Sequence, residues 1–523
     1  MLQQLFSTLV FEVQATWASC SIFARFGIGL LSTWMAWRFW TFTIRPLLRP
    51  NEPLELPYWI PYYGHAGAFF TDSHKLIRRA LKYFGELEPF SLTIAGTRYY
   101  VISSPRDTRP FFAESDALTT DGFLDRALIA FGCAPQRLDT LWKLNTPTQV
   151  NPKGKSMIHL TQDLFKQDLV PGPTFDALLG RYQNALDHLL SWDRLVGAYP
   201  PLVNDQREPI SLYDICTDFI VNANQMVMFD SSLFAIDAEM ATEIRTFTDE
   251  LWKLFHQTPF ADTTEAKRML RQYNTDFKKY LHLPQESRKG EMRVIRMLTE
   301  TYTELEIHED DQAAMLTMVW WAGVANAYKA AFWVLAYILS DPELRESVRE
   351  ETAPAVGADG KIDWNYLAKQ CPRLLSIYHE TLRLIKRDVI VRQVVRDTTL
   401  AGKRLRKDSI AVIPTCQLHD NPEIYGSNTA SFNPDRFLKD PDLANKTLLS
   451  FGGGRHYCPG RHFVALEIFG LVAVLVNRYD LKMAFPEPFP RRDESLITLG
   501  VSRPVLGDDL QVTLNWSDVS ESL

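Results

Sequence analysis

One stretch near the C-terminal end, Phe451 to Gly460, restricts what this chain can fold into more than any other. It places three glycines before Cys458 and a Pro-Gly pair after it, and an apolar run follows from His462 to Val476. Glycine adopts positive φ at little cost, so such a loop can pass close to a flat group. A cysteine at the start of a helix is stabilised as a thiolate, which is a ligand of haem iron. The residues alone leave a second interpretation open, a glycine-rich turn with a buried cysteine.

Length and charge narrow the function classes. The chain has 523 residues, 46% of them hydrophobic, and no Gly/Ser-rich linker divides it beyond the N-terminal region. We therefore expect one large catalytic domain behind an N-terminal segment. The net charge of −7 argues against nucleic acid as a partner. The six cysteines form no Cys-x-x-Cys pattern, which predicts reduced thiols in a domain that faces the cytosol.

Residues 1–45 are rich in aromatic and aliphatic side chains and are predicted to form a membrane anchor. The most apolar part, Phe26 to Ile44, is interrupted only by Arg38 and approaches the roughly 20 residues that cross a bilayer. Arg45 and Arg49 follow it, which favours a single pass with the downstream chain in the cytosol. A helix that lies along the membrane surface is the alternative.

Prolines recur between residues 46 and 61, which predicts an extended, semi-rigid hinge because proline at this density excludes helix. The remaining residues, 62–523, form the predicted catalytic domain. Most of it has helical spacing, so the predicted fold class is mainly α with a small β part. The expected strands are Phe90–Ile94 and Arg98–Ile102 in a hairpin, Val389–Val395, Ile410–Ile413, and a terminal pair of Leu496–Gly500 with Leu510–Leu514.

A long helix is predicted from Asp310 to Leu339, apolar on nearly every face. Asn326 and Lys329 lie at its middle, which favours a buried central helix over a second membrane span. Gly323 inside it costs about 1 kcal/mol relative to alanine. A flat group packed against that turn would explain the glycine, and so would the close packing of a neighbouring helix.

A second helix, from Pro372 to Lys386, carries Glu380 and Arg383 three residues apart on one face. The apolar residues around them predict that this pair is buried, and a buried pair needs further partners. Arg436, which lies in the segment Phe432-Asn433-Pro434-Asp435-Arg436-Phe437, is the expected third member.

Taken in order, these pieces resemble the cytochrome P-450 superfamily. The resemblance rests on the anchor and hinge, Ala322-Gly323 in a buried helix, Glu380-x-x-Arg383, Phe432-x-Pro-x-Arg436-Phe437 and the cysteine loop. It covers essentially the whole chain. It implies a mostly helical P-450 fold with a small β part, preceded by the N-terminal membrane helix.

The same resemblance implies haem b as the cofactor, with the Cys458 thiolate as the iron ligand. It implies a structural triad behind the haem, formed by Glu380, Arg383 and Arg436. The family pattern usually has arginine two residues before the cysteine, where this chain has His456, so we expect Arg392 to take over a propionate contact. The full set of expected cofactor contacts is Cys458, Phe451, Gly454, Arg455, His456 and Arg392.

Thiolate ligation of haem favours cleavage of an O–O bond. The resemblance therefore implies a monooxygenase that inserts oxygen from O₂ into an apolar small molecule, such as a terpenoid, steroid or alkaloid of secondary metabolism. Electrons would come from NADPH through a flavoprotein reductase at the endoplasmic reticulum membrane. The basic surface expected to attract that reductase comprises Arg455, Arg461, His462 and Lys439.

The central helix departs from the family pattern at two positions. The family usually has an acid-threonine pair that relays protons to bound dioxygen, and this chain has Ala325 and Asn326. Asn326 with an ordered water is the expected catalytic substitute. The sequence here resembles the sterol 7α-hydroxylases and prostacyclin synthase, a subgroup that includes an isomerase working without a reductase. The alternative function is therefore a reductase-independent haem-thiolate isomerase or dehydratase that acts on a peroxide.

The substrate pocket is expected at mainly apolar positions, as in most small-molecule sites. These positions lie on the central helix, after the Glu-x-x-Arg helix and in the C-terminal tail. They are Ala322, Ala325, Val389, Val391, Leu499, Gly500 and Val501.

Overall fold

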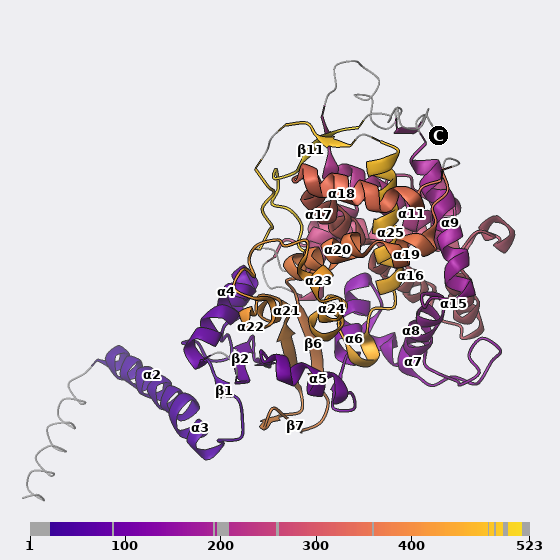
Figure 1. Cartoon of the computed structure of the whole chain (residues 1–523). Helices are drawn as coiled ribbons and strands as arrows, with labels where there is room; N and C mark the ends of the chain where they lie inside the picture. Colours follow the sequence, from indigo (N-terminus) through magenta and orange to yellow (C-terminus); the bar gives the residue numbers. More distant parts are fainter. Residues whose placement is uncertain are drawn as a thin grey trace, which may run out of the picture.

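The computed structural model of the protein describes residues 21–85, 88–191, 194–195, 209–257, 261–357, 360–479, 481–485, 488–494 and 500–514. Figure 1 shows a large helical body with a smaller sheet region beside it, and a helix from the N-terminal end that projects past the sheet. Helices dominate the described residues and strands are short, so the expected fold class, mainly α with a small β part, is confirmed.

The helical elements follow the apolar periodicity of the sequence. In the first part of the chain they are α2 (Ile22–Phe39), η1 (Trp40–Ile44), α3 (Arg45–Leu48), α4 (Ala66–Phe84), α5 (Pro105–Ala113), α6 (Asp121–Phe131), η2 (Pro135–Arg137), α7 (Leu138–Trp142), α8 (Met157–Asp168), α9 (Pro173–Leu189), α11 (Leu212–Phe229), α12 (Ser232–Ile236), α13 (Ile244–Phe255), α14 (Thr264–Leu281), η4 (Gln285–Arg288) and α15 (Arg293–Glu304). They continue with α16 (Glu309–Val324), α17 (Ala327–Leu339), α18 (Pro342–Thr352), η5 (Ala353–Ala355), α19 (Trp364–Gln370), α20 (Pro372–Ile385), α21 (Thr415–His419), α22 (Pro422–Tyr425), α23 (Arg436–Lys439), α24 (Asp442–Thr447), η6 (Gly454–His456) and α25 (Arg461–Asn477).

The main sheet has six strands in the order β1-β2-β3-β9-β6-β4. The expected hairpin is present, with Ala95 and Gly96 at its turn in the left-handed region (φ 47° and 81°). β6 pairs antiparallel with β9 along its whole length, so the strand after α20 lies inside the sheet. The strands are β1 (Leu54–Glu55), β2 (Phe90–Ile94), β3 (Thr97–Val101), β4 (Leu118–Thr119), β6 (Val389–Val394) and β9 (Ser409–Pro414).

Two smaller sheets complete the β part. One has the order β10-β11-β5, and the other is the hairpin of β7 (Thr398–Leu400) and β8 (Lys403–Leu405). β11 (Gln511–Thr513) pairs with β10 (Lys482–Met483) on one side and β5 (Ile210–Ser211) on the other. Of the expected terminal pair, residues 496–499 lie outside the described residues. The pairing of that segment with β11 is wrong, because β10 and β5 take both edges of β11.

The central helix is the deepest element of the core, but it is interrupted. A turn at Ala325 and Asn326 separates α16 from α17. Asn326 Oδ1 accepts a hydrogen bond from the Val501 amide (2.9 Å), and side-chain bonds of asparagine compete with helical structure. The prediction of one helix from Asp310 to Leu339 is therefore corrected at its middle, while its buried position is confirmed.

Two segments of the described chain are long and apolar enough to cross a membrane, Glu309–Leu339 and Gly454–Asn477. Their most apolar windows are 78% and 61% buried within the protein, so both are core helices of this fold. The N-terminal helix α2, which is interrupted by Arg25 and Arg38, is not among them. Its role as a membrane anchor therefore stays a prediction.

Aromatic contacts attach the N-terminal helix to the sheet region. Trp34 stacks on Trp59 with ring centroids 5.6 Å apart, and its Nε1–H donates to the Trp59 carbonyl (2.8 Å). Arg38 donates to the Tyr58 carbonyl and lies over the Trp59 ring (4.6 Å). The proline-rich segment is not a free spacer, because Leu54–Glu55 forms β1 and pairs with β2.

Candidate functional site

The glycine loop holds Cys458 at the start of α25. Gly452 and Gly454 have φ of 77° and 66°, which favours glycine, and the Cys458 amide donates to the Phe451 carbonyl (3.0 Å). Cys458 is exposed on one side and closely surrounded by the loop on the others. The surrounding protein atoms raise the pKa of its thiol, whereas hydrogen bonds from backbone amides at the N-terminus of α25 lower it. These amides stabilise a thiolate, and a metal ion bound to the sulfur would complete its deprotonation.

The glycines of this loop also allow close packing by α5. A Cβ atom on Gly453 would lie 2.6 Å from the Phe112 ring, and one on Gly454 would lie 3.0 Å from the Phe112 carbonyl oxygen. Phe451 is half-buried against the main core. The loop is therefore shaped by its protein neighbours as well as by any group that Cys458 binds.

The central helix is largely buried, but two small residues near its middle are exposed. Ala322 and Gly323 are exposed, although Val324 and most of α16 and α17 are buried. Gly323 also serves helix packing, because a Cβ there would lie 2.7 Å from Met228 Sδ on α11. The exposed stretch ends α16, and α17, which follows it after a two-residue turn, packs against α25.

Two basic residues, Arg392 and His456, lie at the cysteine loop. Arg392 on β6 is 7% exposed, donates to the Val391 carbonyl (2.8 Å) and approaches the Gly453 carbonyl (3.4 Å). Burial lowers the pKa of Arg392 to about 10, and no carboxylate in the described chain neutralises it. His456 lies 3.2 Å from Thr120 Oγ1, and burial followed by Arg392 lowers its pKa to about 4.

These features fit haem. A helix-start cysteine suits the iron, and small exposed residues on a buried helix suit the flat ring. Arg392, a buried cation without a counterion, suits a propionate, because burying an unpaired charge is otherwise costly. Arg455 is placed differently from Arg392: its side chain is 73% exposed and its ion pair is with Asp116 (3.8 Å). A cofactor contact by Arg455 stays a prediction.

Glu380, Arg383 and Arg436 meet in the core. Glu380 accepts two hydrogen bonds from Arg383 (2.8 Å each) and two from Arg436 Nε (3.1 and 3.0 Å). Both members of the Glu380–Arg383 pair are fully buried. Arg383 also donates to the His419 carbonyl (2.8 Å), and the Asn433 amide donates to Glu380 (3.1 Å). These bonds join α20 to the segments before the cysteine loop.

Comparison with known families decides the kind of protein. A family model described as Cytochrome P450 matches residues 202–507. The chain belongs to the cytochrome P450 family. The expected resemblance is therefore confirmed, and the protein is an oxidoreductase of the cytochrome P450 monooxygenase family. Membership implies haem with a cysteine thiolate as iron ligand, in agreement with the fit described above.

Curated relatives and a solved structure share most of the chain. It is 26% identical over 457 residues to the cytochrome P450 monooxygenase poxD of Penicillium oxalicum, covering 83% of this chain and 88% of that protein. Mouse cytochrome P450 7B1 is 22% identical over 494 residues, with 87% and 89% covered. The solved structure of retinoic-acid-bound cyanobacterial CYP120A1 shares the fold, with a TM-score of 0.64, 17% identity, and 89% and 100% of the two chains covered.

Asn326, the expected catalytic residue of this P450, is tied to the C-terminal tail. Its Oδ1 accepts from Val501, and Val501 forms a β-bridge with Lys386. Lys386 Nζ pairs with Asp388 Oδ2 (2.6 Å). The ionisable side chains near this turn thus include this pair at the end of α20 and the buried Lys329 on α17, whose pKa burial lowers to about 8. Sequence reasoning missed the Lys386–Asp388 pair because no motif includes it.

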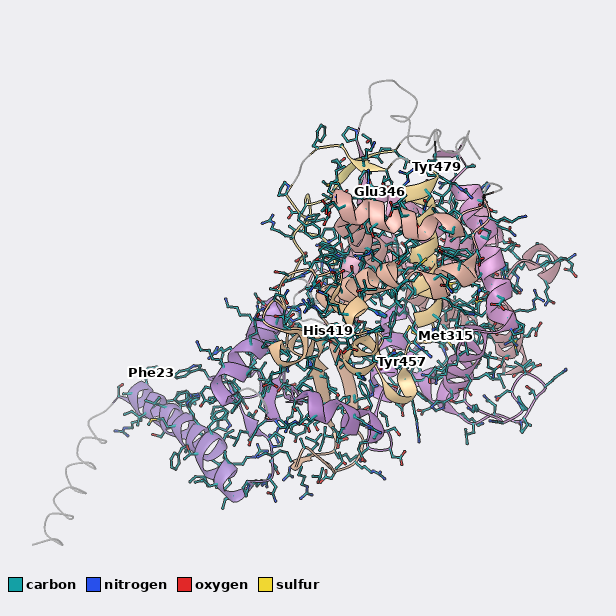
Figure 2. The ribbon with its side chains drawn as sticks, viewed as in Figure 1. Phe23, Met315, Glu346, His419, Tyr457 and Tyr479 are labelled. Atoms are coloured by element: carbon teal, nitrogen blue, oxygen red, sulfur yellow. The ribbon has the colours of Figure 1, made fainter. Side chains whose placement is uncertain are left out.

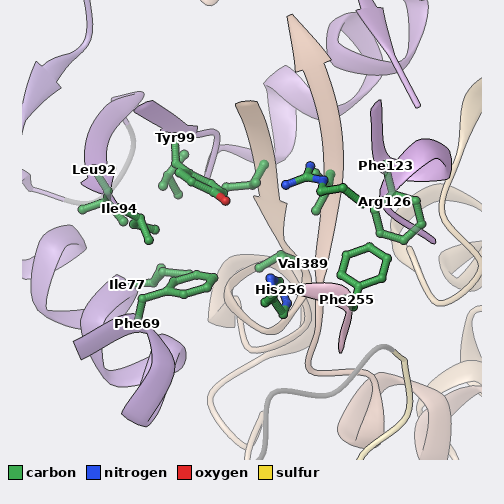
Figure 3. A pocket seen from close by; sticks show the side chains of 13 residues that line it. Phe69, Ile77, Leu92, Ile94, Tyr99, Phe123, Arg126, Phe255, His256 and Val389 are labelled. Carbon is green, nitrogen blue, oxygen red and sulfur yellow. The ribbon is translucent and has the colours of Figure 1, made fainter. Parts of the chain in front are cut away.

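The expected pocket residues divide between an apolar cavity and the core. Val389 and Val391 line a cavity of about 40 Å³ (Figure 3). Ala325 is fully buried beside Asn326, and its assignment to the pocket stays a prediction. A Cβ on Gly500 would lie 2.2 Å from Asn326 Oδ1, so this glycine serves close packing.

Ala322 is exposed on the central helix, as a residue facing a bound group would be. Val501 is buried and bridges the tail to the core. Leu499 lies outside the described residues. Sequence reasoning missed the cavity residues on α4, α6 and α13, because those helices carry no recognisable motif.

Replacing Arg392 with methionine tests the propionate contact. Methionine keeps an apolar stem and removes a buried cation, so the haem-free protein should not lose stability. Haem should dissociate about ten- to a hundredfold faster, because a charged hydrogen bond contributes about 1.5–3 kcal/mol. The measurement is the rate of haem transfer to an excess of apomyoglobin. Arg396→Met is the matched control, because Arg396 is 61% exposed and pairs with Glu114, and equal effects of both substitutions would contradict the assignment.

Proposed function

We propose that this protein is a haem-thiolate monooxygenase that inserts one oxygen atom from O₂ into an apolar small molecule. The observation that carries the proposal is the placement of Cys458 at the N-terminus of α25, with the buried and unneutralised Arg392 beside its loop. Family membership supports the same reaction. Electrons would come from NADPH through a flavoprotein reductase.

Each part of the site would have a separate task. When bound, haem would supply the activation of O₂. The amides at the start of α25 would stabilise the Cys458 thiolate, and Arg392 and His456 would hold the propionates. The Glu380–Arg383–Arg436 triad would fix the segments behind the loop. Ala322 and Gly323 would leave room for the ring.

The substrate class follows from the pocket and the relatives. The cavity at Val389 and Val391, of about 40 Å³, is lined mainly by apolar side chains, which suits one apolar part of a terpenoid, steroid or alkaloid. Relatives named as cytochrome P450 monooxygenases include poxD of Penicillium oxalicum and efuG of Hormonema carpetanum. A further relative is the mouse 24-hydroxycholesterol 7-alpha-hydroxylase. The name of the last relative refers to a sterol and supports oxidation of a polycyclic apolar compound. We propose a role in secondary metabolite biosynthesis.

The N-terminal part supports attachment to the endoplasmic reticulum membrane. The apolar side chains of α2 are largely exposed, among them Phe23, Phe26 and Leu30. We propose residues 1–45 as a single-pass anchor, 46–61 as the hinge, and 62–523 as the catalytic domain in the cytosol. The bonds of Arg38 to Tyr58 and Trp59 would fix the angle between anchor and domain.

The reductase would bind on the cysteine side. Arg461 donates to the Cys458 carbonyl (3.1 Å) and lies over the exposed Tyr457 ring (4.8 Å). Together with Arg455 and Lys439 it would attract an acidic partner. His462, also expected on this surface, would add no charge at pH 7, because burial lowers its pKa. Electrons delivered on this face would enter next to the iron ligand.

Isotope labelling tests the reaction. A strain lacking this chain should accumulate the substrate, which is then offered to the purified holoenzyme with NADPH, reductase and labelled O₂. One labelled oxygen atom in the product, with turnover lost when the reductase is omitted, supports the monooxygenase. Turnover of this compound that persists without reductase and NADPH, with no label gained, overturns it.

The alternative function is a reductase-independent isomerase or dehydratase that acts on a peroxide. The specific observation that favours it is the central turn, where Ala325 is buried and Asn326 Oδ1 is already bonded to Val501. No acidic side chain stands at either position. The omission of reductase described above separates the two functions.

Asn326→Ala tests the proton relay. If the amide orders a water for proton transfer, the substitution should lower the fraction of NADPH converted to product and raise peroxide release several-fold. The measurement is coupling, as product formed per NADPH consumed. Trp333→Phe is the matched control, because it removes another bond between α17 and the tail, from Trp333 Nε1 to the Ser502 carbonyl (2.8 Å). Equal uncoupling in both variants would assign the effect to the tail, and unchanged coupling in Asn326→Ala would exclude the relay.

A further inference from the structure

The cavity at β6 is walled by aromatic rings from distant parts of the chain. Phe69 of α4, Tyr99 of β3 and Phe123 of α6 line it, together with Val389 and Val391 (Figure 3). β6 alternates between two environments: Val389 and Val391 face the cavity, and Arg392 lies among the cations of the cysteine loop. The cavity and the predicted haem site therefore lie on opposite faces of strand β6.

One full positive charge reaches this apolar space. Arg126, on α6, is half-buried and points towards Tyr99 across the cavity in Figure 3. Its Nε donates to the Gly122 carbonyl (3.2 Å), and its side chain is hydrogen-bonded to Tyr99. No carboxylate of the described residues lies within ion-pair distance of its guanidinium. The terminal nitrogens of Arg126 thus lie among aromatic rings without a counterion. Such a charge is energetically costly to bury unless a bound ligand supplies the counterion.

His256 adds hydrogen-bonding capacity to the cavity but no charge. Its ring makes edge contacts with Phe255 (5.3 Å between centroids) and Phe69 (6.3 Å). Burial, followed by the charge of Arg126, lowers the pKa of His256 to about 4, so the imidazole is neutral at pH 7. The cavity therefore carries a net charge of one, located on Arg126.

The size of the cavity and the charge of Arg126 together favour a small anionic group as the ligand. A cavity of about 40 Å³ holds roughly three water molecules, since each needs about 10–15 Å³. A carboxylate group has that size, carries one charge, and matches the planar fork of an arginine. A phosphate carries nearly two charges and needs more donors than the Arg126 amines and the Tyr99 hydroxyl provide.

We propose that Arg126 is the anchor for a carboxylate on an otherwise apolar substrate, with the Tyr99 hydroxyl as the neighbouring donor. This inference rests on the proposed function, because it names the substrate class of the same enzyme. The rings of the cavity would contact the apolar part next to the acid. Arg126 would then set which end of the substrate is held away from the haem.

The test compares two ligands with the same hydrocarbon chain, myristic acid, which is charged, and its neutral methyl ester, methyl myristate. A flexible chain is used so that the shape of the ring system does not decide binding. Calorimetry on the full-length holoenzyme in detergent should give at least about tenfold tighter binding of the acid, as expected for a charge-assisted hydrogen bond. Arg126→Gln should abolish this preference, and Arg126→Lys should keep part of it.

Arg396→Gln is the control, because Arg396 is 61% exposed and lies outside the cavity, and it should keep the wild-type preference. Equal binding of acid and ester by the wild type, including no binding of either, overturns the proposal. A preference that survives Arg126→Gln overturns it too. The reduced carbon monoxide spectrum of the same samples reports separately on the haem thiolate, so failure of the proposed function is seen independently.

Discussion

Cys458→Ala should abolish the red-shifted Soret band that the reduced carbon monoxide complex of a thiolate-ligated haem shows. Alanine offers no ligand, and only a thiolate pushes electron density towards iron strongly enough to produce that spectrum and favour O–O cleavage. Turnover of any substrate should fall below detection. Both the spectrum and the product should be measured at equal haem concentration.

Two further substitutions separate loss of the ligand from loss of the fold. Cys458→His should retain haem through an imidazole and give the unshifted band of a histidine-ligated protein. Cys416→Ala removes a cysteine that is buried elsewhere and should keep the red-shifted band. A normal thiolate spectrum in Cys458→Ala would show that another residue holds the iron.

Glu380→Gln should produce the largest loss of stability among the substitutions considered. The side chain keeps its size but loses its charge, so Arg383 and Arg436 are left without their anion in the core. Breaking a buried ion pair by removing one partner costs about 3–5 kcal/mol. We expect a lower thermal midpoint and a lower ratio of haem to protein, because the triad fixes the segments before the cysteine loop.

Glu346→Gln is the matched control for this experiment. Glu346 and Arg349 have the same spacing of three residues on a helix, lie 3.5 Å apart, and are 49% and 36% exposed. Figure 2 labels Glu346 on α18, at the edge of the helical body. An exposed pair contributes about 0–1 kcal/mol, so this substitution should leave the midpoint and the haem content nearly unchanged. Similar losses in both variants would contradict a special role for the buried triad.

Local chemistry explains which elements could be predicted. The hairpin at Ala95 and Gly96 was predictable because only a few turns accept such a loop between two apolar strands. The burial of α16 and α17 followed from their apolar faces, and that of Glu380 and Arg383 from apolar neighbours on one helix. Each of these signals lies within about 30 residues of chain.

Contacts between distant segments explain what could not be predicted. The turn at Asn326 depends on Val501, which is 175 residues away, and nothing near Asn326 marks the interruption. The pairing of β11 with β10 and β5 also joins separate segments and has no local signal in the sequence. Arg38 interrupts the apolar N-terminal segment, and only the structure shows that it contacts Tyr58 and Trp59.

The sequence by itself determined the chemistry of this protein: a cysteine in a glycine loop at a helix start, and a buried acid with two arginines. These features are local, because a ligand type and a helical spacing are written in consecutive residues. Only the tertiary structure decided which side chains surround that chemistry. The place of Arg126 in the apolar cavity depends on helices and strands that meet in space. For Arg392, which was expected to contact a propionate, the structure added that its charge is buried without a counterion.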